Sequence, residues 1–371
     1  MRTLVISDLH VGLEGDGAQL EDPWAVAALR AAAEQADRLI LLGDILEFRR
    51  GPVRHALAAT QRILPNLVQG LGGGKEIVIV PGNHDHELLS GWFDRRSVES
   101  APQAPEPLGL ASPVKWRKRE ALATLANALG PGGATVSASY PGVWLREDVY
   151  ATHGHYLDCL TTVPAFERLA AGTMAKILGR PLSQLAAVDD YEAALSPIYA
   201  WMYASAQVTH SAKEQDGSDR IWYRIREAHG ASRIAWDAAV LAVVAGLNAA
   251  GIGPVKPELT GVEFRRAGLL AFGAVLESLG VGARYAIFGH THRAGPLPGD
   301  DLDEWQAPTG ARIFNSGCWV SMPTYTAGDP SSPYRPGFAI ELDDDGEPPR
   351  LVNLLDGQQR SGSALDTPVQ G

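Results

Sequence analysis

Short apolar segments that end in a cluster of histidine, aspartate or asparagine recur along this chain and constrain its fold most strongly. Each segment has the length and β-branched character of a buried strand. The five clusters are Ser7-Asp8-Leu9-His10, Gly43-Asp44-Ile45-Leu46-Glu47, Gly82-Asn83-His84-Asp85, His153-Gly154-His155 and Gly289-His290-Thr291-His292. Ligands of open α/β sheets gather outside the carboxyl ends of the strands. We therefore expect the clusters to meet, and their side chains indicate one metal site.

The first hundred residues alternate between predicted strands and helices. Strands are expected at Thr3–Ile6, Arg38–Leu42 and Glu76–Val80, with helices from Asp22-Pro23 and over Pro52–Leu71 between them. This order implies an α/β fold with parallel strands and right-handed crossovers. A helix over Val114–Leu129 and strands at Asp148–Thr152, Arg284–Phe288, Arg312–Asn315, Gly337–Leu342 and Leu351–Leu355 are expected further on.

Residues 156–282 carry helical rather than strand spacing, as in Phe166, Leu169 and Thr173. We interpret this stretch as an α-helical insertion into a domain formed by residues 1–155 and 283–356. Its ends lie next to His153 and His290 in the chain, which favours a lid over the site. The polar residues 357–371 are expected to be a disordered tail.

Composition limits the partners and the compartment. Lys and Arg number 32 against 43 Asp and Glu, a net charge of −11, which argues against a nucleic-acid partner. The two cysteines, Cys159 and Cys318, do not make a disulfide framework. Met1 and Arg2 lead directly into the first strand, so we expect no secretion signal, and no apolar run is long enough for a transmembrane segment. We expect a cytoplasmic protein; its oligomeric state is left open.

The donor atoms of the clusters indicate which metal ions they suit. Carboxylate, imidazole and amide groups without thiolates favour Mn²⁺, Fe or Zn²⁺, with Mn²⁺ our first choice. The candidate ligands exceed what one ion needs, so we expect two divalent ions that share one carboxylate, with Asp44 suited to that place. The candidates are Asp8, His10, Asp44, Asn83, His153, His290 and His292.

Taken in order, the five clusters resemble the motifs of the calcineurin-like metallophosphoesterase superfamily. The resemblance implies a two-sheet α/β sandwich and a dinuclear site, so that the domain formed by residues 1–155 and 283–356 would be the catalytic domain. By matching positions, one ion would take Asp8, His10 and His292, the other Asn83, His153 and His290, and Asp44 would bridge them. His84 would be the catalytic histidine, oriented by Asp85. A metal-bridging hydroxide would then attack phosphorus.

Two features point to one branch of the superfamily. Glu47 stands where Asp is common, and Asn315-Ser-Gly-Cys-Trp319 follows later; both resemble the branch of the UDP-2,3-diacylglucosamine pyrophosphatases. That branch often carries Arg at the position of His84 and has a shorter insertion. Hydrolysis of a small phosphate mono- or diester is therefore the first hypothesis. A pyrophosphatase acting on a nucleotide-linked lipid is the second, and a non-catalytic scaffold the third.

Two further residues are candidates for contact with a small phosphorylated substrate. His155 follows the candidate ligand His153 by two positions, and Arg293 directly follows His292. A guanidinium group suits phosphate oxygens well.

Overall fold

The computed structural model describes residues 1–13, 15, 17–208, 241–257, 260–326 and 329–356. The expected disordered tail and the middle of the expected insertion, residues 209–240, lie outside the described residues. Among the helices that the structure describes, none combines the length and apolarity needed to cross a membrane.

The strands join in one hydrogen-bonded path, in the order β10-β9-β1-β2-β3-β5-β6-β7-β8. β1, β2 and β3 pair in parallel, β6, β7 and β8 do the same, and β9 and β10 extend one edge antiparallel. The strands are β1 Thr3–Ile6, β2 Arg38–Leu42, β3 Glu76–Val80, β4 Ala111–Pro113, β5 Thr135–Arg146, β6 Val149–Thr152, β7 Tyr285–Phe288, β8 Arg312–Asn315, β9 Phe338–Leu342 and β10 Arg350–Asn353.

β5 divides this path into two layers. Its first half pairs in parallel with β3 and its second half antiparallel with β6. Alternate residues of β1 to β3, such as Val5 and Ile40, share one buried cluster with Ala151 and Ile287 of β6 and β7. The two halves of the sheet therefore face each other, and the expected α/β sandwich is confirmed.

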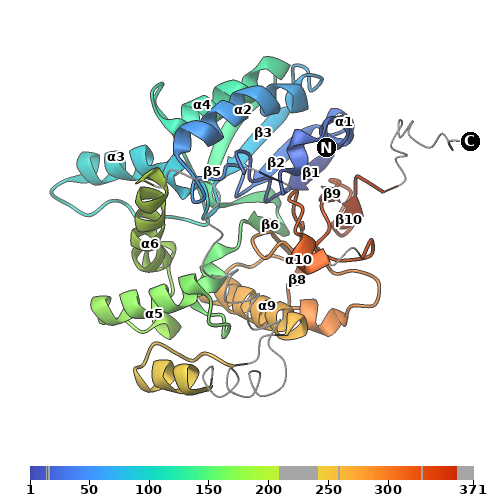
Figure 1. Ribbon diagram of the computed structural model, residues 1–371. Coiled ribbons are helices and arrows are strands. Elements are labelled where there is room, and N and C mark those ends of the chain that lie inside the picture. Colours follow the sequence, from blue (N-terminus) through green and yellow to red (C-terminus); the bar gives the residue numbers. More distant parts are fainter. Residues whose placement is uncertain (14, 16, 209–240, 258–259, 327–328, 357–371) are drawn as a thin grey trace, which may run out of the picture.

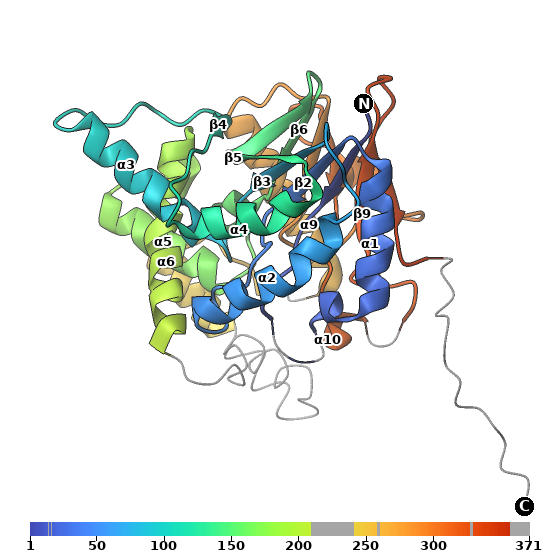
Figure 2. The same cartoon turned by 90° about the horizontal axis from the view of Figure 1, so that it is seen from above.

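Helices cover the outer faces of both layers (Figures 1 and 2). Leu41 and Ile79 pack with the helices α1, α2 and α4, whereas Phe288 stacks on Phe272 of α9 with ring centroids 4.2 Å apart. The α-helices include α1 Pro23–Gln35, α2 Val53–Val68, α3 Ser90–Ser100, α4 Ala121–Leu129, α5 Phe166–Leu178, α6 Val188–Val208, α9 Gly261–Ser278 and α10 Pro323–Thr326, and residues 241–249 are also helical. The 3₁₀ helices are η1 Gln19–Glu21, η2 His86–Leu89, η3 Gly130–Gly132, η4 His155–Cys159, η5 Leu182–Gln184 and η6 Leu302–Trp305.

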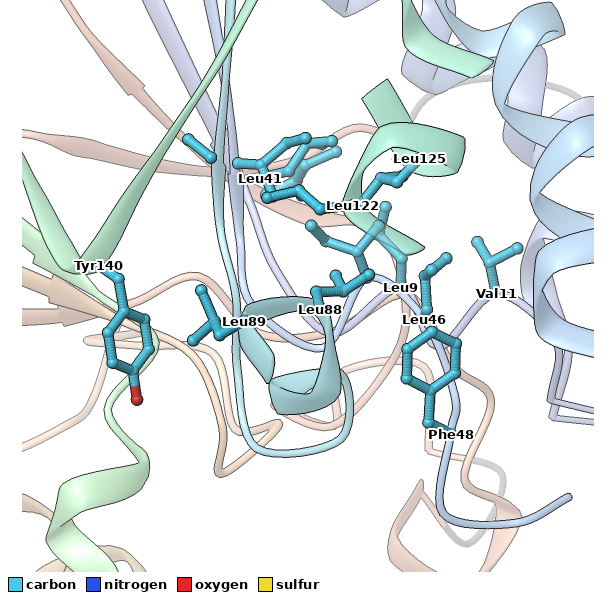
Figure 3. Close-up of a cluster of buried hydrophobic side chains, with 14 of the residues drawn as sticks. Leu9, Val11, Leu41, Leu46, Phe48, Leu88, Leu89, Leu122, Leu125 and Tyr140 are labelled. Atoms are coloured by element: carbon cyan, nitrogen blue, oxygen red, sulfur yellow. The ribbon is translucent and has the colours of Figure 1, made fainter. Parts of the chain in front are cut away.

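The loops that carry the polar clusters are anchored by apolar residues between the polar ones. Leu9 stands between Asp8 and His10, and Leu46 precedes Glu47. Figure 3 shows Leu9 and Leu46 in a buried cluster with Leu88 of η2. Burial of these side chains fixes the loops. The polar residues next to them in the chain, such as Asp8 and His10, then point away from the apolar cluster.

Several sequence predictions match the observed elements. β1, β2, β3 and β8 have the expected bounds. The helix expected over Val114–Leu129 was wrong in its first half, because the chain becomes helical only at Ala121. β5 was not predicted at all; Pro141, Gly142 and several Ser and Ala residues lower its strand propensity. Its pairing with both β3 and β6 compensates for that composition.

The helical region is attached to the core in more than one place. α9 packs against the outer face of β7, as described above. α6 lies beside α3 in both Figure 1 and Figure 2, and Tyr140 of β5 and Tyr156 of η4 both donate to Glu192 of α6. The division into a catalytic domain and a helical insertion stays a prediction.

Candidate metal centre

The seven candidate ligands come together at the carboxyl ends of β1, β2, β3, β6 and β7. These strands lie near one another along the sheet path, so the loops that follow them meet. Two groups of donor atoms form there and are connected through Asp44, which also forms a third set of possible donors with His10 and His84.

The first group contains Asp8, His10 and His292. His292 Nε2 lies 3.1 Å from Asp8 Oδ1 and 3.2 Å from His10 Nε2. His10 Nε2 and Asp8 Oδ1 are 4.0 Å apart. This spacing allows one cation to contact a carboxylate and two imidazole nitrogens.

The second group contains Asn83, His153 and His290. Asn83 Oδ1 lies 3.0 Å from His153 Nε2 and 3.1 Å from His290 Nδ1. With Asp44, the two histidines form another set of donors that could hold a metal ion.

Asp44 lies between the two groups. Its Oδ2 atom is 3.8 Å from His10 Nε2 and 3.2 Å from His153 Nε2, whereas Oδ1 accepts a hydrogen bond from the backbone nitrogen of His84 at 2.7 Å. Burial alone would raise the pKa of Asp44, but the rings of His153, His84 and His10 hold it well below its usual range. An ionised carboxylate oxygen is thus directed at both groups.

Polar atoms in the centre are arranged as a cation would require. Asp8 Oδ1 is buried and receives no hydrogen bond among the described residues, while Oδ2 accepts from Ser7 Oγ and from the backbone nitrogen of His290. The side-chain oxygen of Asn83 faces three other candidate ligand atoms: His153 Nε2, His290 Nδ1 and Asp44 Oδ2. If the amide group were rotated by 180°, this oxygen would accept hydrogen bonds from Arg49 instead. A cation among these atoms would satisfy Asp8 Oδ1, and the side chain of Asn83 lies within reach of the same cation.

Strained backbone is concentrated at the same residues. The non-glycine residues with positive φ in the described chain are Asp8 (55°), His10 (44°), Asp44 (50°), His290 (63°) and His292 (59°). All five are candidate ligands. Such conformations cost on the order of 1–3 kcal/mol each and persist at sites where the side chain must be aimed.

Glycines let the loops approach one another closely. A Cβ atom on Gly43 would lie 2.3 Å from the ring of His153, and one on Gly82 would lie 2.4 Å from Asp44 Oδ1. Any side chain at these two positions would displace a candidate ligand.

The rings of three candidate ligands are fixed through their second nitrogen. His153 Nδ1 lies 3.0 Å from the carbonyl oxygen of Leu42, and His10 Nδ1 lies 3.0 Å from Glu47 Oε2. His290 Nε2 lies 3.1 Å from Asp158 Oδ1. Partners of this kind orient a histidine so that its other nitrogen can bind a metal.

His84 lies at the edge of the centre and is oriented by Glu47. Its Nδ1 atom is 3.0 Å from both carboxylate oxygens of Glu47. We expected Asp85 to orient His84, and this was wrong. Asp85 accepts hydrogen bonds from the backbone nitrogens of Ile45 at 2.7 Å, Leu46 at 3.2 Å and Gly82 at 2.7 Å, so it ties the loop after β2 to the loop after β3.

His155 and Arg293, the two residues expected to contact the substrate, bind other residues of the protein. His155 is 1% exposed, with Nε2 lying 3.1 Å from the hydroxyl of Tyr140. Arg293 donates two hydrogen bonds to Asp300, at 2.8 and 2.6 Å, and lies over the ring of Trp305. One side chain is therefore enclosed and the other is neutralised, so neither is placed to bind a substrate phosphate.

Sequence reasoning missed two residues of the centre. Asp158, in η4, contacts His290 from within the region expected to be an insertion. Arg49 lies next to the amide of Asn83, donates to Glu167 at 3.0 Å and stacks over Tyr199. Asp158 stands five positions after His153, and Arg49 two positions after Glu47; this proximity is the signal that could have found them.

Comparison with known families agrees with this geometry. The model of the calcineurin-like phosphoesterases matches residues 1–199, more than half of the chain. The chain belongs to the calcineurin-like phosphoesterase family. Members are metal-dependent hydrolases of phosphoric esters, and the family resemblance of the motifs is confirmed. The match includes the clusters from Asp8 to His153, whereas His290 and His292 lie beyond it. A comparison with curated proteins gave no significant match.

Proposed function

We propose that this phosphoesterase uses two divalent cations, with Asp44 shared between them. The observation that supports this most directly is the position of Asp44 Oδ2, within 3.8 Å of His10 Nε2 and 3.2 Å of His153 Nε2. Asp8, His10 and His292 would hold one ion, and Asn83, His153 and His290 the other. The nitrogen and oxygen donors suit Mn²⁺ first, with Fe or Zn²⁺ as alternatives.

The bound ions would supply two effects: activation of a water for attack at phosphorus and neutralisation of charge on the phosphoryl oxygens. The chain's own residues would hold the ester in place for this. Asp44 and Asp8 are ionised ligands whose remaining oxygens are fixed by backbone nitrogens of His84 and His290. The donor set is therefore held rigid before the substrate arrives.

His84 would hold and release the proton for the leaving oxygen. Burial lowers the pKa of His84 to about 4, although Glu47 and Asp44 act to raise it. The ring is thus neutral near pH 7, and it would have to take up the proton released by the attacking water before it could give one to the leaving oxygen. Glu47 holds Nδ1, which leaves Nε2 to carry that proton.

Hydrolysis of p-nitrophenyl phosphate and bis-p-nitrophenyl phosphate by metal-stripped protein, with and without added Mn²⁺, tests the proposal. We expect Mn²⁺-dependent turnover of at least one ester and loss of that turnover in Asp44→Asn. Turnover that needs no metal ion, or that survives in Asp44→Asn, would contradict it. Failure to bind metal and to turn over either ester would favour the scaffold hypothesis.

The remaining hypotheses concern the substrate, the subcellular location and the role of the helical region. The substrate is proposed to be a small phosphorylated molecule, with a nucleotide-linked lipid diphosphate as the alternative. The resemblance to the UDP-2,3-diacylglucosamine pyrophosphatases stays a prediction, as does the cytoplasmic location. Residues of α6, including Ser196, Tyr199 and Tyr203, line a cavity that His84 also lines, which supports the interpretation of this region as a cover for the substrate.

A further inference from the structure

Two cavities of similar size border the metal centre, and different ligands line each of them. The first has a volume of about 450 Å³ and is lined by Asn83 and His84. The second has a volume of about 440 Å³ and is lined by His290 and His292. Each volume lies within the range of pockets that bind small molecules, on the order of 300–1,000 Å³.

The first cavity, called here the His84 cavity, lies between α3 and α6. Aromatic side chains and charged groups of both signs line it, together with serines and a few small or apolar residues. Its lining includes Arg49, Phe93, Arg96, Asp189, Tyr199 and Tyr203. Arg96 stacks over Trp92 and donates to a backbone carbonyl oxygen, that of Glu106. A substituent with both an apolar and a polar part fits this mixture.

The second cavity, called here the His292 cavity, lies between α9 and the loops after β7 and η4. Its wall is mostly apolar and includes Leu157, Phe264, Leu269, Phe288 and Trp305. The two arginines in the wall are already paired: Arg265 with Glu304 at 2.5 Å and Arg293 with Asp300 at 2.6 Å. An uncharged aromatic or aliphatic substituent fits it.

The two cavities come together at the ligand atoms. Asn83 lines the first and His290 lines the second, and Asn83 Oδ1 and His290 Nδ1 are 3.1 Å apart. A phosphorus atom held at this centre would therefore border both cavities. The single ester group of a phosphomonoester could occupy only one of them.

We propose that the substrate is a phosphodiester with a large substituent on each side of phosphorus. The leaving substituent lies in the His84 cavity, since His84 is the proton donor proposed for the leaving oxygen, and the retained substituent lies in the His292 cavity. This inference rests on the proposed function and makes it more specific. Water adds to phosphorus, the bond to the leaving oxygen breaks, the leaving group departs as an alcohol with one proton, and the retained substituent remains as a phosphomonoester.

A series of substrates with one leaving group tests the inference on the Mn²⁺-loaded protein. The three substrates are p-nitrophenyl phosphate, methyl p-nitrophenyl phosphate and bis-p-nitrophenyl phosphate. They share p-nitrophenolate and differ only in the retained substituent. We expect kcat/KM for the bis ester to exceed that for the methyl ester at least tenfold. Equal values, or a preference for the monoester, would overturn the inference.

Substitutions that fill one cavity at a time separate the two substituents. A Cβ on Gly268 of α9 would be 3.7 Å from its nearest neighbour, Thr291 Cγ2, so Gly268→Phe can extend into the His292 cavity. We expect it to lower kcat/KM for the bis ester at least tenfold more than for the methyl ester. Ala200→Phe, in the His84 cavity, should slow all three substrates because they share the leaving group.

Ala274→Phe is the matched control for both variants. Ala274 is on α9, like Gly268, but lines a third cavity whose wall contains none of the candidate ligands. It should leave the ratio between the bis and methyl esters unchanged. If Gly268→Phe and Ala274→Phe change that ratio equally, the His292 cavity does not hold the retained substituent.

A binding measurement keeps this inference separate from the proposed function. Calorimetric titration of Mn²⁺-loaded protein with diphenyl phosphate and with phenyl phosphate should show tighter binding of the diester, and Gly268→Phe should remove the difference. Loss of turnover for every ester would contradict the proposed function. Turnover of the monoester with equal binding of the two phenyl phosphates would contradict only the two-cavity inference.

Discussion

Both carboxylate oxygens of Glu47 lie 3.0 Å from Nδ1 of His84, and one of them also lies 3.0 Å from Nδ1 of His10. One side chain thus connects a candidate metal ligand to the candidate proton donor. Burial alone would raise the pKa of Glu47, but the rings of His84 and His10 hold it well below its usual range. A change at this residue should therefore affect metal binding and turnover together.

Glu47→Gln keeps the size of the side chain but removes its charge. We expect turnover and Mn²⁺ affinity to fall together, on the order of 10–100-fold, as for other partners that orient a metal-binding histidine. Titration with Mn²⁺ and steady-state kinetics on one preparation measure both quantities. Unchanged metal affinity would show that Glu47 does not orient His10.

His84→Ala should separate catalysis from metal binding. Its ring lies in the wall of the cavity beside the centre and is not in either proposed ligand set. We expect turnover to fall on the order of 10²–10⁴-fold, the usual contribution of a positioned acid or base, with the bound Mn²⁺ nearly unchanged. An equal loss of metal would reassign His84 as a ligand.

Asp85→Ala should affect stability through the backbone that it holds. It would leave the buried backbone nitrogens of Ile45, Leu46 and Gly82 without their acceptor. Because each unsatisfied donor costs about 1–3 kcal/mol, we expect the free energy of unfolding to fall by several kcal/mol. Urea unfolding of the metal-free protein measures it. A loss below about 1 kcal/mol would show that these hydrogen bonds do not stabilise the loops.

Glu192 should make stability depend on pH. Burial would raise its pKa, but His86 and the hydroxyls of Ser196 and Tyr140 lower it from 4.5 to about 2. This lowering contributes stability above about pH 4.5, on the order of 3 kcal/mol, and the contribution is lost as the pH falls towards 2. Glu192→Gln should therefore destabilise the metal-free protein at pH 6 and have much less effect near pH 2.5.

Urea unfolding at several pH values compares Glu192→Gln with Glu277→Gln, an exposed glutamate of α9. The control should leave the free energy of unfolding nearly unchanged at every pH. A Glu192→Gln effect that is independent of pH would show that the charge of Glu192 is not what attaches α6 to the core.

Much of the fold and most of the centre could be predicted because their signals are local. The first strand and the Asp-Leu-His cluster after it lie within eight consecutive residues. Parallel pairing of such strands is enough to bring the clusters together at one edge of the sheet. β5 could not be predicted, since pairing on both sides, rather than its own composition, stabilises it. Asp158 and Glu192 act across long stretches of chain, to His290 and to His86. Asp85 was given the wrong role because adjacency to His84 in sequence does not place two side chains on the same side of the backbone.

The amount of Mn²⁺ bound per chain tests the central claim most directly. Metal-stripped protein, loaded with Mn²⁺, freed of excess ions and analysed for manganese, should hold two ions per chain. Asp44→Asn should hold at most one, whereas the exposed-site control Asp343→Asn should hold two. One ion in the unsubstituted protein, or two ions retained with unchanged affinity in Asp44→Asn, would contradict a centre in which Asp44 is shared.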